Sequence, residues 1–151
     1  MNKMIENIKN EFSEYVIMFE RGTFCNVYYE DSYIISYLFD YKIKEINSEL
    51  SCGFPRTSVN KVRTLLEEKN INYIILDRTH NYDEDDKMEF KDNKYGELCN
   101  KAYKYVTMKK RLENISRYIL NNLEKENIVE IVQKCEEKLN ETRKIYSNKS
   151  C

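Results

Sequence analysis

The first half of the chain alternates between helical and extended hydrophobic patterns. Residues 1–14 carry apolar side chains every three or four positions, which predicts a short amphipathic helix. Residues 14–20, EYVIMFE, form a compact run of apolar, β-branched and aromatic side chains that is typical of a buried strand. The segment 24–29, FCNVYY, has the same character. Because residues 21–23 place a glycine between the two runs, we expect a tight hairpin.

Helices and strands continue to alternate as far as residue 78. Asp31 and Ser32 are expected to cap a helix, because their side-chain oxygens can accept hydrogen bonds from the free N–H groups of its first turn. Four further elements are predicted in order: a half-exposed strand at 41–46, a short strand at 51–54, a helix at 59–69 capped by Thr57 or Ser58, and a buried strand at 71–77. Such alternation predicts an α/β or α+β sheet domain.

The composition changes in the second half. Residues 79–94, THNYDEDDKMEFKDNK, are acidic and polar with little periodicity, so we expect an acidic connection. From Tyr95 onward apolar side chains recur every three or four residues, which predicts either two helices or one long helix. Asn121 and Asn122 are the expected point of reversal if the segment is a helical hairpin. We therefore divide the chain into a sheet domain at 1–78, a connection at 79–94 and a helical tail at 95–151.

Basic residues concentrate in this tail. Residues 99–151 contain 12 basic and 7 acidic side chains, although the net charge of the whole chain is only -1. The stretch 101–111, KAYKYVTMKKR, has five basic residues with tyrosines between them, a composition that suits phosphate contact and base stacking. A helix with a tyrosine-lined core face and a solvated lysine face explains it equally well. Its candidate DNA-binding residues are Lys101, Lys104, Lys109 and Lys110.

The composition argues against several other classes of protein. The 5 cysteines form no C-x-x-C pair and His80 is the single histidine, which favours neither a disulfide framework nor a zinc site. No apolar run approaches the roughly 18–20 residues of a membrane span, so we expect a soluble, cytoplasmic chain without a membrane partner. Residues 83–86 are four consecutive acids, but consecutive acids cannot all converge on one Mg²⁺ ion, so a nuclease is disfavoured. We predict no catalytic residue, cofactor or metal.

The first half also resembles a known family. The strings YVIMFERGTFCNVYYEDSYIISYLFDYKIK and CGFPRTSVNKVRTLLEEKNINYIILDR resemble the mismatch-recognition domain of the MutS family, which is the first domain of those DNA mismatch repair proteins. That family has the pattern G-D-F-Y-E-L-F-x-x-D-A followed by G-x-P-x-H before a helix. The residues that match in order and spacing are Gly22, Phe24, Tyr28, Asp31, Gly53, Pro55 and Leu66. The resemblance covers residues 12–78 and implies a mixed β-sheet flanked by helices.

The resemblance implies a role for Phe24. In the family, the matching phenylalanine enters the minor groove and stacks on a mispaired or unpaired base, while a glutamate two residues later hydrogen-bonds that base. This chain has Asn26 at the glutamate position, so a hydrogen bond remains available but a carboxylate does not. Thr23 and Cys25 also depart from the family pattern. Arg21 and Arg56 complete the set of candidate DNA-binding residues in this half.

These observations lead to two functional hypotheses. The first is a stand-alone, divergent, non-catalytic DNA-binding protein in which Phe24 acts as a wedge and Asn26 as a weakened base contact. None of the 3 glycines begins a P-loop, so we expect any repair role to need partner chains that supply an ATPase. The alternative is a protein–protein interaction or oligomerisation module that keeps the fold, has lost mismatch reading, and binds a protein partner or a second copy through the C-terminal helices.

Overall fold

A computed structural model describes residues 3–78 and 80–149 of the chain. The outermost residues of the predicted first helix and of the tail, 1–2 and 150–151, lie outside this description, as does residue 79. The chain divides into two compact units, Met1–Met108 and Lys109–Cys151, and the boundary falls inside a helix.

A mixed six-stranded sheet is the centre of the first unit, with the strand order β3-β4-β2-β1-β5-β6. The strands are β1 (Val16–Arg21), β2 (Phe24–Tyr28), β3 (Ile43–Ile46), β4 (Glu49–Pro55), β5 (Tyr73–Asp77) and β6 (Asp83–Met88). Strands β1 and β5 run parallel, and the other neighbours in the order are antiparallel. The hairpin between β1 and β2 therefore lies in the middle of the sheet.

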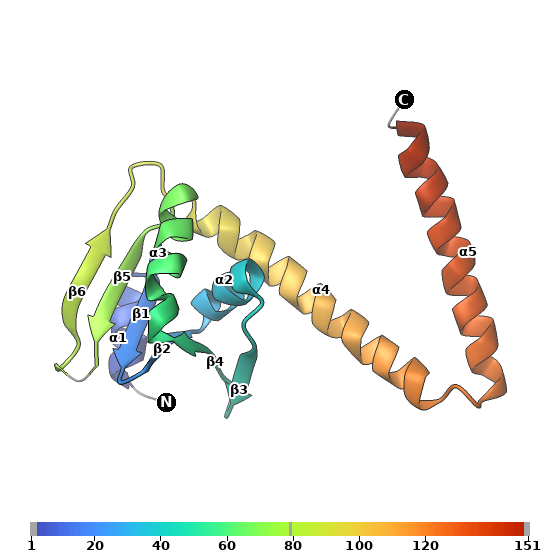
Figure 1. Cartoon of the computed structure of the whole chain (residues 1–151), viewed down its shortest axis with the longest axis horizontal. Coiled ribbons are helices and arrows are strands. Elements are labelled where there is room, and N and C mark those ends of the chain that lie inside the picture. The colour runs from blue at the N-terminus through green and yellow to red at the C-terminus, as the bar shows by residue number, and fades with distance from the viewer. Residues whose placement is uncertain (1–2, 79, 150–151) are drawn as a thin grey trace. The chain divides into compact units, whose positions relative to one another are not determined.

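Helices cover both faces of this sheet (Figure 1). The helices are α1 (Lys3–Glu11), α2 (Glu30–Phe39), α3 (Val59–Glu68), α4 (Tyr95–Asn121) and α5 (Glu126–Lys149), and a 3₁₀ turn at Arg56–Ser58 precedes α3. On one face, α1 packs Ile5 against apolar side chains of β1 and β5. On the other face, α2, α3 and the first turns of α4 bury a larger core. The core residues that these three helices contribute are Ile34, Ile35, Val59, Val62, Leu66, Tyr95, Leu98 and Ala102.

The mixed α+β architecture predicted from the sequence is confirmed. The tail forms two helices, and α4 ends at Asn121, so the expected break between helices at Asn121 and Asn122 is also confirmed. The strand predicted at 51–54 is longer than expected and begins at Glu49.

The prediction that residues 79–94 form only an acidic connection is wrong, because this segment contains β6. Its residues Asp83–Met88 pair with β5, and they shield the main chain of that buried strand along one edge. Charged side chains are common on edge strands, where they discourage pairing with other molecules. Because most side chains of β6 are charged, its sequence lacks the alternation of apolar and polar residues by which a strand is recognised.

The predicted capping roles of Asp31 and Ser32 are also wrong. Helix α2 begins one residue earlier, at Glu30, and the Asp31 side chain is buried instead of lying at the helix end. The Ser32 hydroxyl donates a hydrogen bond back to the Val27 carbonyl at 3.3 Å. Ser58 does occupy the N-cap position of α3, but its side chain makes no capping hydrogen bond to any residue that the structure describes.

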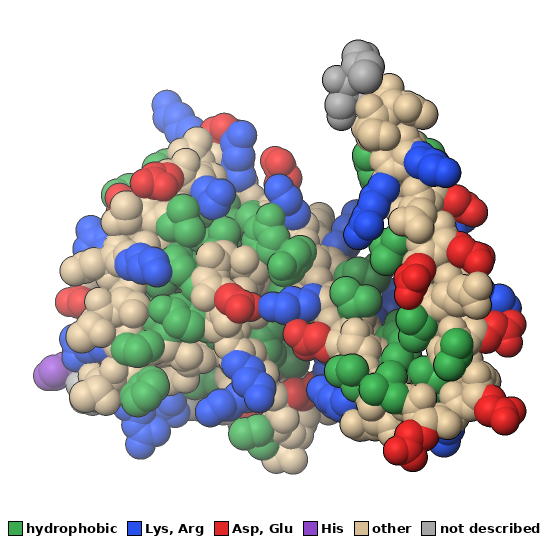
Figure 2. Space-filling view, turned by 45° about the vertical axis from the view of Figure 1, so that its right-hand side comes forward, with side chains coloured by type: hydrophobic (Ala, Val, Ile, Leu, Met, Phe, Trp, Pro, Cys, Tyr) green, Lys and Arg blue, Asp and Glu red, His purple; other side chains and the backbone are tan. Residues whose placement is uncertain are grey.

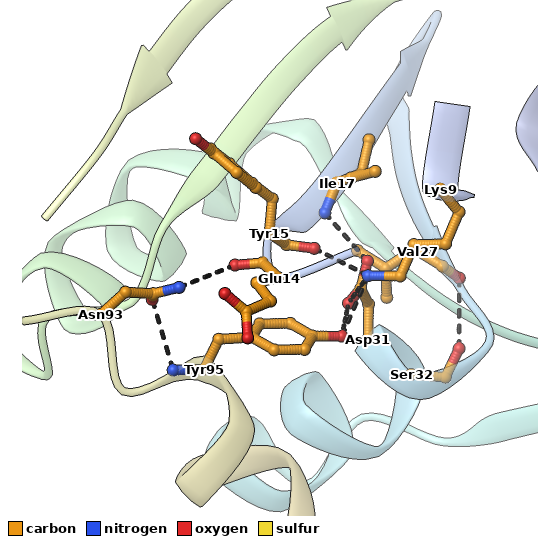
Figure 3. Close-up of polar contacts among 9 residues, drawn as sticks. All are labelled: Lys9, Glu14, Tyr15, Ile17, Val27, Asp31, Ser32, Asn93 and Tyr95. Atoms are coloured by element: carbon orange, nitrogen blue, oxygen red, sulfur yellow. Dashed lines mark hydrogen bonds and ion pairs between the residues drawn. The ribbon is translucent and has the colours of Figure 1, made fainter. Parts of the chain in front are cut away.

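Asp31 instead joins four segments in a buried polar cluster (Figure 3). Its carboxylate accepts hydrogen bonds from the Lys9 ammonium of α1 at 2.6 Å, the Ile17 N–H of β1 at 2.9 Å and the Tyr95 hydroxyl of α4 at 2.7 Å. The Lys9 ammonium also donates to the Tyr15 carbonyl at 2.8 Å. Burial raises the pKa of Asp31, and the Lys9 charge and these hydrogen bonds oppose that rise.

Replacement of Lys9 tests this cluster. Lys9→Met leaves the Asp31 carboxylate buried without its cation, and loss of one partner of a buried ion pair costs about 3–5 kcal/mol. Without the cation the pKa of Asp31 rises further, so the folded state retains a proton that the unfolded state has lost. The stability deficit should therefore grow as the pH is raised from about 4 to about 7.

Urea denaturation at several pH values measures this deficit. The control is Lys3→Met on the exposed surface of the same helix, which should change stability by less than about 0.5 kcal/mol. Equal deficits for both variants, or a Lys9→Met deficit that shrinks toward neutral pH, would contradict the assignment.

The cysteines should differ sharply in reactivity. Cys25 of β2 and Cys52 of β4 are fully buried, and burial raises the pKa of both thiols, that of Cys52 to about 12. Because the thiolate is the nucleophile, iodoacetamide should label exposed Cys135 first in dilute protein and reach Cys25 and Cys52 only after unfolding. Peptide mass mapping over time measures the order. Labelling of Cys25 as fast as that of Cys135 would show that the β2–β4 pairing opens readily.

Candidate nucleic-acid interface

The hairpin that carries Phe24 is short and firmly held. Gly22 and Thr23 form its two-residue turn, and Gly22 adopts a φ of 59°, which glycine accepts without steric cost. Arg21 and Phe24 face each other on either side of this turn. The Thr23 carbonyl accepts a hydrogen bond of 2.9 Å from the backbone N–H of Arg56, which is the first residue after β4. The turn is therefore fixed to a third strand as well as to its own two.

The Phe24 side chain points away from the hydrophobic core of the first unit. Its side chain is 55% exposed, whereas Cys25 and Val27 on the opposite face of β2 are completely buried. Alternation of this kind is what a strand produces, since successive side chains lie on opposite faces. The strand register places the Phe24 ring between Arg21 of β1 and Pro55 of β4. The fold thus holds an apolar ring in solvent at a fixed position.

Asn26 lies two residues along on the same face and packs over Gly53. The two residues are paired across β2 and β4, and a Cβ atom added to Gly53 would lie 2.8 Å from Asn26 Oδ1. Glycine at this position therefore leaves the space that the Asn26 amide occupies. The carboxamide is half-buried and sits beside Phe24 on the same strand surface, where it can donate or accept a hydrogen bond.

An ion pair stabilises the strand end beneath Phe24. Arg56 Nη2 lies 2.7 Å from Glu20 Oε2, and Glu20 is only 4% exposed while the Arg56 side chain is half exposed. Burial raises the pKa of Glu20, and Arg56 opposes the rise. The guanidinium thus neutralises a buried carboxylate and still presents part of its surface to solvent.

A third arginine reaches this end of the sheet, and the sequence analysis missed it. The Arg78 N–H donates to the Glu20 carbonyl at 2.9 Å, and Arg78 Nη1 donates to the Tyr28 hydroxyl at 3.4 Å. Its position directly after the buried strand ILD was the available signal, because β5 lies beside β1 in the sheet and runs in the same direction. Arg21, Arg56 and Arg78 therefore all lie at the end of the sheet that carries Phe24.

Carboxylates occupy the other side of the same end. Asp77 at the end of β5 pairs in register with Asp83 at the start of β6. Asp77 also forms a hydrogen bond with His80 Nδ1, which raises the pKa of the imidazole. The surface is thus basic at Arg21 and Arg56, at the ends of β1 and β4, and mixed around β5 and β6, where Asp77 and Asp83 lie beside Arg78.

Lys101, the first of the predicted lysines, does not lie near Phe24. Lys101 lies beside Lys69 and Asn70, next to the start of β5, and so at the opposite end of the sheet from Phe24. Lys104 follows on α4 within the first unit, whereas Lys109 and Lys110 belong to the second unit. Within the first unit, the structure brings Arg21, Phe24, Asn26 and Arg56 from the predicted set to one end of the sheet and Lys101 to the other end.

Two further features bear on the kind of site. Among residues 3–78 and 80–149 there is no group of three or more His, Cys, Asp or Glu side chains arranged to hold a metal ion. The four consecutive acids at 83–86 lie in an extended strand, which turns alternate side chains to opposite faces. In the described part of the chain, no helix combines the length and the apolar character that crossing a membrane requires.

Comparison with known proteins assigns this architecture to a family. A search of the curated proteins finds no match to the chain. The family model for MutS domain I matches residues 1–94, which include the whole sheet with β6 and end directly before α4. The match extends beyond the segment 12–78 that carries the sequence resemblance. On this evidence the chain belongs to the MutS domain I family.

Proposed function

We propose that the end of the sheet that carries Phe24 binds duplex DNA and that the Phe24 ring enters weakened base steps. The observation that carries this proposal is the exposed phenyl ring at the start of a strand whose next residue is fully buried. An apolar wedge must be held stiffly, because a mobile ring would fold back onto the protein instead of separating two bases. The turn at Gly22, the Thr23–Arg56 hydrogen bond and the Arg56–Glu20 ion pair supply that stiffness.

The selectivity of such a wedge comes from the DNA. Separating a stacked base step costs a few kcal/mol, and a mispaired step is already poorly stacked and easily kinked. The same ring therefore enters a mismatch at lower cost than it enters a matched duplex. No sequence of bases has to be read for this preference to arise.

Arg21 and Asn26 would contribute in different ways. Arg21 is exposed and directly opposite Phe24, so its guanidinium can contact a phosphate on a strand into which the ring inserts. The neutral amide of Asn26 can bond to a base edge but adds no negative charge, so mismatch discrimination is weaker than with a carboxylate. The lysines of α4 would contact phosphates elsewhere on the DNA.

Catalysis is not part of this function. Domain I of MutS is a recognition domain, and we propose that this chain likewise binds DNA without altering it, so that repair would depend on other proteins. The activity to measure is therefore binding.

Replacement of Phe24 tests the wedge. Stacking of one base on an aromatic side chain contributes about 1–3 kcal/mol, so Phe24→Ala should weaken binding to a single-mismatch duplex by about fivefold or more. Binding to matched duplex should change much less, because the Phe24 ring rarely inserts between well-stacked base pairs. Fluorescence anisotropy with both duplexes measures the two affinities.

Ile46→Ala is the matched control for this experiment. Ile46 is 65% exposed, and it flanks the two-residue turn at Asn47 and Ser48 of the β3–β4 hairpin, at the opposite end of the sheet. It should bind both duplexes as the unsubstituted protein does. Equal binding of matched and mismatched DNA by the unsubstituted protein, or an unchanged preference in Phe24→Ala, would refute the wedge.

The salt dependence of binding tests the arginine contact. Each neutralised phosphate releases counterions, so loss of one contact should reduce the slope of log K against log salt concentration by about 1. Arg21→Gln should show this change and should weaken binding to matched and mismatched duplexes equally. An unchanged slope would mean that Arg21 does not touch the DNA. Lys3→Gln, an exposed lysine of α1, serves as the control.

A further inference from the structure

One row of side chains on α5, apolar except for Thr142, follows a heptad spacing. Steps of four and three residues alternate along this helix through Ile128, Val132, Cys135, Leu139, Thr142 and Tyr146. Helix α4 has the same spacing in the second unit and just before it, at Met108, Leu112, Ile115 and Ile119. A mean period of 3.5 residues keeps one stripe of side chains facing a partner helix, as in coiled coils. We call these two rows the heptad stripes.

Most of both stripes is exposed. Ile128 beside the turn is buried, but Leu112 is 61%, Ile115 56% and Leu139 54% exposed. Figure 2 shows hydrophobic side chains gathered at the surface of the helical segment. Helix α4 and helix α5 are joined by only the four residues 122–125, and the exposure of Leu112, Ile115 and Leu139 shows that the two stripes do not form a closed core.

The second unit is too small to be stabilised by its own core. It contains 43 residues, Lys109–Cys151, and units near about 40 residues usually need a disulfide, a metal or oligomerisation. Cys135 is a free thiol, and the residues that the structure describes form no metal-binding group. The 24 residues of α5 extend about 36 Å, whereas the part of α4 in this unit, 109–121, extends about 20 Å. That part of α4 is too short to cover the whole stripe of α5.

One stretch of each helix carries a charge opposite to that of a stretch on the other. The α4 stretch 109–117 has the four cations Lys109, Lys110, Arg111 and Arg117 against one acid, Glu113. The α5 stretch 126–137 has the four acids Glu126, Glu130, Glu136 and Glu137 against one cation, Lys134. In a pair related by a two-fold axis, α4 of one copy can lie against α5 of the other, and the complementary contact then occurs twice. The surface is complementary to itself.

We propose that the heptad stripes of α4 and α5 bind a second copy of this chain, so that the protein is a homodimer held together by its helical segments. The dimer buries Leu112, Ile115 and Leu139 and places the basic stretch of each α4 beside the acidic stretch of the partner's α5. This inference concerns the second unit and does not depend on DNA binding by the first.

Light scattering coupled to size-exclusion chromatography of the full chain tests the proposal. The unsubstituted protein should have the mass of two chains in the micromolar range. Ile115→Glu and Leu139→Glu place a charge in the stripe and should reduce the mass to that of one chain. Glutamate is a good helix former, so these substitutions do not penalise the helix itself. The control is Val129→Glu, since Val129 is 67% exposed on α5 but lies off the stripe, and this variant should remain dimeric.

A second readout uses the unsubstituted protein alone. Cys135 lies on the stripe of α5, so its alkylation should slow at least severalfold when the protein is concentrated from nanomolar to micromolar. A single-chain mass throughout this range, or a Cys135 labelling rate independent of concentration, would overturn the proposal. Loss of the dimer in Val129→Glu as readily as in Leu139→Glu would also overturn it, because the effect would then be one of charge alone.

Discussion

One buried carboxylate, that of Asp31, fixes how the segments of the first unit meet. It accepts hydrogen bonds from Lys9 of α1, Ile17 of β1 and Tyr95 of α4. These donors are separated from Asp31 in the sequence by 22, 14 and 64 positions, respectively. A buried ion pair is costly to desolvate, and apolar replacements are often as stable. Its effect is directional, because an alternative packing of α1 or α4 would leave a charge buried without a partner. We infer that the cluster favours one arrangement of the helices around β1 over the alternatives.

The position of Phe24 follows from that arrangement. Strand β1 is fixed between β2 and β5, and β2 in turn lies between β1 and β4, so the strand that carries Phe24 has neighbours on both sides. Leaving a phenyl ring in water forgoes about 1.5–3 kcal/mol of burial. Insertion between bases would recover this free energy, and a rigid strand avoids the entropy of ordering the ring on binding.

Charge divides the end of the sheet that carries Phe24 into two halves. Arg21 and Arg56 lie at the ends of β1 and β4, whereas Asp77 and Asp83 lie on β5 and β6, beside Arg78. The acidic half protects an exposed sheet edge from pairing with other chains, and under the proposed function it would also restrict the side from which DNA approaches. The near-neutral net charge of the chain conceals this division. Opposite charges are separated in the helical segment too, where they make α4 and α5 complementary.

Local sequence patterns by themselves determined most helices and strands, the central hairpin and the end of α4 at Asn121, because hydrophobic period and turn residues act over a few positions. The exposure of Phe24 was expected from the resemblance to the MutS domain, since local pattern alone favours a core position for a phenylalanine in a strand. Tertiary structure alone decided that Asp31 is a buried anchor instead of a cap, and that the acids at 83–86 form an edge strand. It alone brought Arg78 beside Tyr28 and placed Lys101 at the far end of the sheet. Each of these depends on which strands become neighbours, and that pairing arises from contacts between residues distant in sequence.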